Sequence, residues 1–187
     1  MMKWSSFALG VLLIGLLSAG TLAQAQQPQT QNDPLAALRF LVGEWEGAIA
    51  GTLGEGSGIR VYESILDDKY LLLRHSSVRL PQPASPRGDR HREVGIFSYD
   101  SERDTVVYRQ FVVEGFVIRY TCAPLGGDAL GLVCVSESVE SGAGMRARVT
   151  IEARNSFEFS ETFDLAEVGQ ELQTLFTNRW LRRPSIR

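Results

Sequence analysis

Residues 116–154 read FVIRYTCAPLGGDALGLVCVSESVESGAGMRARVTIEAR. Apolar and polar residues alternate in three runs of this stretch, and clusters of Gly, Pro, Ser and Asp separate the runs. Alternation with a period of two is typical of β-strands that have one buried face. The stretch therefore predicts three consecutive antiparallel strands joined by short turns.

The first hairpin of this stretch contains the only two cysteines of the chain, Cys122 and Cys134. The register that places them opposite each other also aligns an apolar pair and an opposite-charge pair, Val117 with Val139 and Arg119 with Glu137. We expect a Cys122–Cys134 disulfide, which an oxidising compartment favours. Two cysteines without a Cys-x-x-Cys motif, together with two distant histidines, do not form a metal-binding pattern, so no metal or other cofactor is expected.

The second hairpin indicates which face of the sheet is buried. A two-residue Gly142-Ala143 turn places Glu137 opposite Arg148 and extends a row of alternating charges, which belongs in water. The opposite face carries aromatic and small residues, and we expect it to face inward. Its predicted members are Phe116, Ile118, Tyr120, Ser136, Ser138, Met145, Ala147, Val149 and Ile151.

The rest of the chain continues the same pattern. Asp33-Pro34 starts one short amphipathic helix at 34–42, and a long polar loop covers 80–91. Many short strands without helices between them indicate an antiparallel meander, whose edges disappear if it closes into a barrel. The fold class is therefore all-β: an up-and-down, lipocalin-like barrel of about ten strands. The predicted strands are 44–52, 58–66, 69–79, 92–99, 105–113, 115–122, 130–140, 145–154, 158–165 and 171–181.

A ten-stranded barrel leaves an interior cavity, because eight strands already enclose space for one small ligand. Sparse hydroxyl groups among apolar side chains suit a small hydrophobic molecule, although a fully packed core stays an alternative. Glu161 shares a face with Phe159 and Phe163. There it anchors a ligand donor or acts as an acid; the alternatives are an ion pair with an inward Arg or a register slip that places it outside. The candidate ligand-binding residues are Phe116, Ile118, Tyr120, Ser136, Ser138, Ala147, Val149, Phe159, Glu161, Phe163 and His75.

The N-terminal segment indicates export. Residues 1–25 combine Lys3, an apolar run at 7–17 and a small-x-small site ending at Ala25, which is typical of a cleaved signal peptide, with an uncleaved anchor as the alternative. We expect residues 26–32 to be a disordered tether, and 33–187 to form one periplasmic or secreted domain without stable membrane insertion. The net charge of −3 and the pI near 5.5 argue against nucleic acid as a partner.

Two segments resemble a known family. Residues 40–47 (FLVGEWEG) match the F-L-x-G-x-W-x-G opening of nitrobindin-like, calycin-type barrels, closest to their exported bacterial branch, and residues 95–100 (GIFSYD) resemble a mid-barrel segment of that group. The resemblance implies a ten-stranded barrel capped by a short helix. We expect Trp45 to pack in the closed barrel end, with Gly43 ending the helix and Gly47 allowing a close backbone approach.

The resemblance also implies haem as an alternative ligand, because nitrobindins bind haem through a His in a late strand. The last His of this chain is His91, and the segment 171–181 offers Thr177, Asn178 and Arg179 instead. His75 is the remaining candidate for iron. A metal-free isomerase or hydrolase that uses Glu161, Tyr120 or His75 is a further alternative to non-catalytic binding.

Overall fold

The computed structural model describes residues 33–184, except residues 53 and 84. The predicted signal peptide 1–25 and tether 26–32 lie outside the described residues. The chain forms a short 3-10 helix, Ala36–Leu41, and ten strands. The strands are β1 (Gly43–Ile49), β2 (Gly56–Ile65), β3 (Tyr70–Arg79), β4 (Asp89–Asp100), β5 (Thr105–Val112), β6 (Val117–Pro124), β7 (Gly131–Glu140), β8 (Arg146–Asn155), β9 (Glu158–Ala166) and β10 (Gln173–Arg182).

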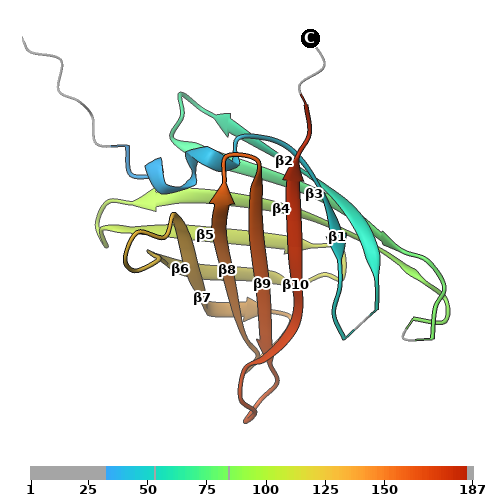
Figure 1. The fold of residues 1–187 in the computed structure, drawn as a ribbon. Coiled ribbons are helices and arrows are strands. Elements are labelled where there is room, and N and C mark those ends of the chain that lie inside the picture. The colour runs from blue at the N-terminus through green and yellow to red at the C-terminus, as the bar shows by residue number, and fades with distance from the viewer. Residues whose placement is uncertain (1–32, 53, 84, 185–187) are drawn as a thin grey trace, which may run out of the picture. The chain divides into compact units, whose positions relative to one another are not determined.

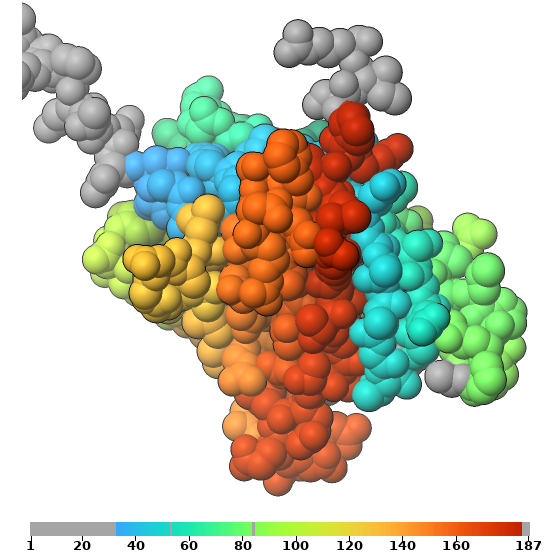
Figure 2. Space-filling view, viewed as in Figure 1, coloured from blue at the N-terminus to red at the C-terminus, as the bar shows by residue number. Residues whose placement is uncertain are grey.

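The ten strands form a closed antiparallel barrel, which confirms the predicted fold class. Each strand pairs with its neighbour in sequence, and β1 also pairs with β10 to close the barrel. This seam lies where the red β10 meets the cyan β1 and β2 in Figure 2. Within the described residues, no helix is both long and apolar enough to cross a membrane.

The β3–β4 hairpin is longer than predicted. Pairing continues to Arg79 opposite Asp89, so β4 begins at Asp89 and the predicted loop 80–91 is too long. His91 therefore lies in a strand, directly opposite Ser77. Residues 89–91 are polar, and their composition is typical of a loop, but they pair with β3 as part of a strand.

The β6–β7 hairpin is joined by the Cys122–Cys134 disulfide, as predicted, with the two residues directly opposite each other. The predicted register holds only as far as Tyr120. A β-bulge between Arg119 and Tyr120 shifts the pairing by one residue, so the predicted pairs Val117–Val139 and Arg119–Glu137 are wrong. The Arg119 guanidinium still lies 3.1 Å from the Glu137 carboxylate.

The β7–β8 register also differs from the prediction. Val135, rather than Glu137, lies opposite Arg148, because the connection is a longer turn with Ser141 and Gly144 at positive φ. The shift is two residues. Since a shift by two returns each side chain to the same face, the inward face of β8 is as predicted.

One end of the barrel is closed by the helix, which lies across it in Figure 1. Leu38 and Leu41 are fully buried there, and the indole N–H of Trp45 donates a hydrogen bond to the Leu41 carbonyl oxygen at 2.6 Å. The Trp45 ring packs edge-on against Phe159, with 4.8 Å between centroids. This half of the barrel interior is therefore filled.

Gly47 permits the close approach of β1 to β10. A Cβ at this position would lie 2.6 Å from a ring carbon of Trp180 and 2.6 Å from the Arg179 carbonyl oxygen. Trp180 is fully buried and occupies the space that a side chain would need. The barrel closes around this tryptophan because residue 47 has no side chain.

Candidate functional site

A cavity of about 370 Å³ occupies the barrel end opposite the helix. Its lining comes from the ends of β1, β3, β5, β7 and β9, the beginnings of β4, β6 and β10, and Met145 just before β8, whereas Trp45 lies at the beginning of β1. Most of the wall is apolar. The apolar lining residues are Ile49, Val112, Phe116, Ile118, Val139, Met145, Phe163, Leu165, Leu175 and Phe176.

One wall of the cavity is polar, and β3 and β4 supply its centre. His75 lies directly opposite Glu93 in the strand register, and His91 precedes Glu93 by two residues, so all three face inward. The Gln110 side-chain amide donates a hydrogen bond to Glu93 Oε2 at 2.8 Å. Asn178 of β10 lines the same cavity and is almost fully buried.

An ion-pair network underlies this polar wall. The buried Arg60 of β2 donates a hydrogen bond to Glu161 Oε1 at 2.7 Å, and its other terminal nitrogen lies 3.6 Å from Glu93 Oε1. Burial raises the pKa of Glu93, but Arg60 and the two histidines outweigh burial, so the pKa falls well below its usual value. Glu93 is therefore a carboxylate at neutral pH, inside the barrel.

The two histidines differ in charge state. Burial and the positive charge of Arg60 lower the pKa of His75, so its imidazole is neutral near pH 7. Burial also lowers the pKa of His91, but its hydrogen bonds to Glu93 and Glu114 outweigh burial and raise the pKa to about 8. Nδ1 of His91 lies 2.8 Å from Glu114 Oε1, and its Nε2 lies 3.4 Å from Glu93 Oε2.

The structure separates the residues proposed from sequence into distinct groups. Four of them line the cavity: Phe116, Ile118, Phe163 and His75. Four are buried in the packed core and do not line the cavity: Tyr120, Ala147, Val149 and Phe159. Glu161 is held in the ion pair with Arg60, which is one of the alternatives predicted for it.

The two serines of β7 also lie outside the cavity lining. Ser136 is half-buried, and its hydroxyl accepts a hydrogen bond from the backbone N–H of Ala147 at 2.8 Å. Ser138 is exposed, so its predicted inward orientation is wrong. The bulge at Arg119/Tyr120 moves the second half of β7 by one residue, which turns Ser138 to the outer face.

Sequence reasoning missed most of the polar wall. His91 was assigned to a loop, and Arg60, Glu93 and Gln110 were not singled out. The signal for His91 was present, because the inward alternation of β4 runs from Gly95 through Glu93 back to His91. Glu93 and Arg60 meet only through the register of β2, β3 and β4, which the sequence does not specify.

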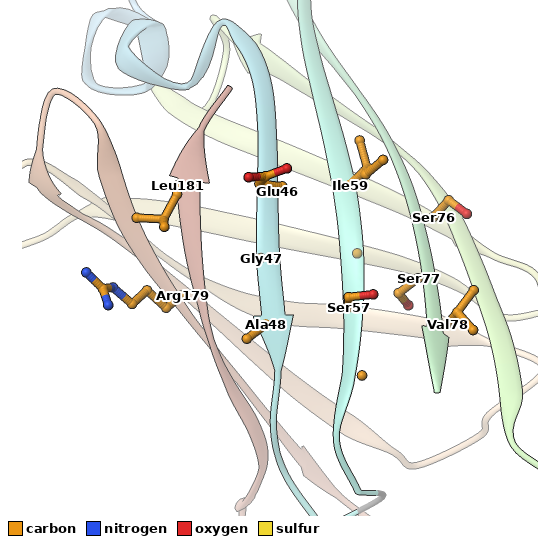
Figure 3. Close-up of a pocket in the computed structure, with 12 residues that line it drawn as sticks. Glu46, Gly47, Ala48, Ser57, Ile59, Ser76, Ser77, Val78, Arg179 and Leu181 are labelled. Atoms are coloured by element: carbon orange, nitrogen blue, oxygen red, sulfur yellow. The ribbon is translucent and has the colours of Figure 1, made fainter. Parts of the chain in front are cut away.

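A second depression lies on the outer wall over β1, β2, β3 and β10. Figure 3 shows its lining, with Ala48, Ser57 and Ser76 among the labelled residues. It is larger than the lumenal cavity, at about 670 Å³, but it is an open groove formed where side chains are short. The groove is open, and the buried polar residue in its lining, Ser77, also lines the lumenal cavity, so we assign the candidate site to the lumen.

Comparison with solved structures supports the fold. The chain is similar to the crystal structure of Rv2717c from M. tuberculosis, with a TM-score of 0.61 and 20% sequence identity over 81% of this chain and 98% of that chain. No family model matches the chain. No curated protein matches it either. At this identity the likeness establishes the barrel fold and nothing finer.

Proposed function

We propose that this protein is an exported, non-catalytic barrel that binds one small, mainly apolar molecule in its lumen. The observation that carries the proposal is the cavity of about 370 Å³ beside a packed barrel half. Its volume falls within the range of ligand pockets, and its mainly apolar wall with a few convergent polar groups has the usual composition of such pockets.

The chemistry of the wall defines the ligand class. Ring and aliphatic side chains of β6, β9 and β10, together with Met145 of the β7–β8 turn, offer a contact surface for a hydrocarbon or aromatic body. His75, Gln110 and Asn178, from β3, β5 and β10, offer hydrogen bonds to one polar end of the ligand. The predicted ligand is therefore a small hydrophobic molecule with a single polar group.

Binding without catalysis fits the placement of the candidate acids. Glu161 is paired with Arg60, and the Tyr120 hydroxyl donates a hydrogen bond to Gln110 Oε1 at 2.7 Å. Neither side chain lines the cavity. Burial raises the pKa of Tyr120 well above its usual value, which keeps this hydroxyl protonated. Of the three residues considered for metal-free chemistry, only His75 faces the ligand space.

Haem is the second candidate, because both histidines line the cavity. Their arrangement does not match ligation from a late strand. His75 and His91 lie on the adjacent strands β3 and β4, whereas β10 presents Asn178 to the cavity. We therefore rank a small apolar molecule above haem, and we include haem in the test.

Export is supported by the sequence of residues 1–25 and by the Cys122–Cys134 disulfide, since disulfides persist in oxidising compartments. Mass spectrometry of the protein from its own cells tests this part of the proposal. We expect a mature N-terminus at Gln26 and no free thiol. An intact leader with two free cysteines would contradict export.

The binding proposal is tested by titrating the protein with a fluorescent apolar probe such as 1-anilinonaphthalene-8-sulfonate. Two neighbouring residues of β7 provide matched variants, because Val139 lines the cavity and Ser138 lies on the outer face. Val139→Phe fills the cavity and should weaken probe binding at least tenfold. Ser138→Phe adds an aromatic ring to the outer wall of the same strand and should leave binding unchanged.

Each outcome decides between the candidates. Saturable binding that Val139→Phe weakens and Ser138→Phe preserves supports the lumenal site. Equal binding by both variants, or no binding by the wild type, contradicts it. A parallel haem titration with a saturable Soret band that His75→Ala abolishes would favour haem over the apolar ligand.

A further inference from the structure

The polar wall of the cavity holds a cluster of three side chains with metal-ligating atoms. His75 Nδ1 lies 3.7 Å from Glu93 Oε2, and His91 Nε2 lies 3.4 Å from the same oxygen. One ligand atom from each residue lies within 4.8 Å of the other two. The three groups therefore converge on one point at the cavity wall rather than standing apart.

These separations are close to those of a metal site. Zinc binds imidazole nitrogen and carboxylate oxygen at about 2.0–2.2 Å, so neighbouring ligands in a tetrahedral site lie roughly 3.4 Å apart. Two of the three pairs already lie near that spacing. A small rotation of the imidazoles would complete the arrangement.

Unpartnered polar atoms of the cluster point independently to a missing ligand. The His75 imidazole is only 5% exposed, and neither of its ring nitrogens has a hydrogen-bond partner among the described residues. Glu93 is 4% exposed, and its Oε1 also lacks a hydrogen-bond partner in that part of the chain. Buried polar atoms rarely lack a partner, and a role in binding an ion is one ordinary explanation for such atoms.

The surroundings orient the cluster as outer-shell groups orient metal ligands. Glu114 Oε1 lies 2.8 Å from His91 Nδ1 and holds a proton on Nδ1, so loss of the Nε2 proton on metal binding would leave the Nε2 lone pair directed toward Glu93. Gln110 holds the Glu93 carboxylate from a third strand. A carboxylate behind a ligating histidine is the usual support of such sites.

The local charge also favours a cation. The carboxylates of Glu93 and Glu161 share one guanidinium, that of Arg60, and the Glu114 carboxylate contacts His91. Arg60 directs its short contact to Glu161 and approaches Glu93 at Oε1, whereas both histidines approach Oε2. Arg79, which also lines the cavity, is compensated by Asp89 at 3.1 Å. Once His91 releases its Nε2 proton to bind a metal, three carboxylates face one guanidinium, and a divalent ion would balance the remaining negative charge.

We propose that His75, His91 and Glu93 bind a divalent transition-metal ion, with zinc as the best match, at the wall of the lumenal cavity. Two imidazoles with one carboxylate select such ions over calcium or magnesium. Three protein ligands leave at least one coordination position, and all three residues line the cavity, so that position is open to a bound molecule. The proposal requires the cavity but not the apolar ligand proposed above.

The test is a metal titration of the full chain, purified without a polyhistidine tag and stripped with a chelator. Zinc is added in competition with a chromophoric chelator, and cobalt is added separately so that its visible absorption reports the coordination. We expect one equivalent of either metal to saturate the protein. The cobalt spectrum should show the intense bands of a four- or five-coordinate site.

Variants of β3 and β4 assign the site to its ligands. His75→Gln and His91→Gln should each weaken zinc binding at least 100-fold, and Glu114→Gln should weaken it about tenfold because outer-shell partners contribute less. Arg92→Gln is the matched control, since Arg92 lies between His91 and Glu93 on β4 but its side chain is exposed. Circular dichroism of each variant verifies that the barrel is folded.

The outcomes separate this proposal from the apolar ligand. Saturable binding that both histidine variants lose and Arg92→Gln retains supports the metal site. No saturable binding, or equal binding by all variants, overturns it. The apolar probe titration is repeated in the presence of the chelator. Probe binding without metal binding would refute only the metal site. Metal binding without probe binding would refute only the apolar ligand.

Discussion

Arg60→Met removes the positive charge at the centre of the barrel and tests the ion-pair network. Arg60 is 2% exposed, and it faces Glu161 at 2.7 Å and Glu93 at 3.6 Å. Its loss leaves two buried carboxylates without their counter-charge. Breaking a buried pair in this way costs about 3–5 kcal/mol of unfolding free energy. For a domain of this size that loss lowers the melting temperature by about 10 °C.

Urea unfolding followed by tryptophan fluorescence measures this loss, because Trp45 and Trp180 are both fully buried. Arg154→Met is the matched control. Arg154 forms an ion pair with Glu152 at 3.2 Å but its side chain is 52% exposed, so the control should lose less than about 1 kcal/mol.

The double variant Arg60→Met/Glu161→Leu sharpens the result. It removes one of the two stranded carboxylates and should recover part of the stability that Arg60→Met loses. If Arg60→Met loses less than about 1 kcal/mol, or no more than Arg154→Met, the reasoning about the buried network is refuted.

Two further predictions concern the closure of the barrel and its disulfide. Gly47→Ala should lower the urea midpoint by an amount equivalent to about 1–3 kcal/mol, because its methyl group would overlap the Trp180 ring; an unchanged midpoint would contradict the close β1–β10 approach. Replacing Cys122 and Cys134 together with Ala should cost about 3 kcal/mol, since the bridge closes a short loop in the unfolded chain. The same midpoint measured with and without reductant checks this, and a wild type insensitive to reductant would contradict it.

The fold was predictable from the sequence because every strand has its own local signal. Period-two alternation and the turn residues between runs locate ten strands, and their bounds agree with the structure to within about three residues at nearly every end. The helix was predicted as 34–42 and is a shorter 3-10 helix, Ala36–Leu41. Closure into a barrel followed from the need to avoid exposed sheet edges.

Register was less predictable, because it depends on irregularities without a clear sequence signal. The bulge between Arg119 and Tyr120 and the longer turn before Met145 each moved the pairing. One residue of shift was enough to turn Ser138 outward. Part of the apolar candidate site is unaffected by these errors, since Phe116 and Ile118 line the cavity, whereas Tyr120, Ala147, Val149 and Phe159 belong to the packed core.

The polar part of the site could not be predicted, because it depends on contacts between strands. His75 and Glu93 are opposite each other only through the β3–β4 pairing across a long polar loop. Arg60 contacts Glu161 across the barrel, although the two residues are 101 positions apart in the sequence. No local pattern specifies that contact, although the aromatic neighbours of Glu161 made an ion pair with an inward Arg one of its predicted alternatives.

A crystal structure of the protein soaked with 1-bromonaphthalene tests the central claim most directly, because the anomalous signal of bromine locates the molecule. The account predicts a bromine peak inside the barrel, among Phe116, Met145 and Phe163, with the Trp45 end of the lumen unoccupied by ligand. A peak only in the outer groove beside Ala48 and Ser57, or no peak at a saturating concentration, would contradict a lumenal binding site.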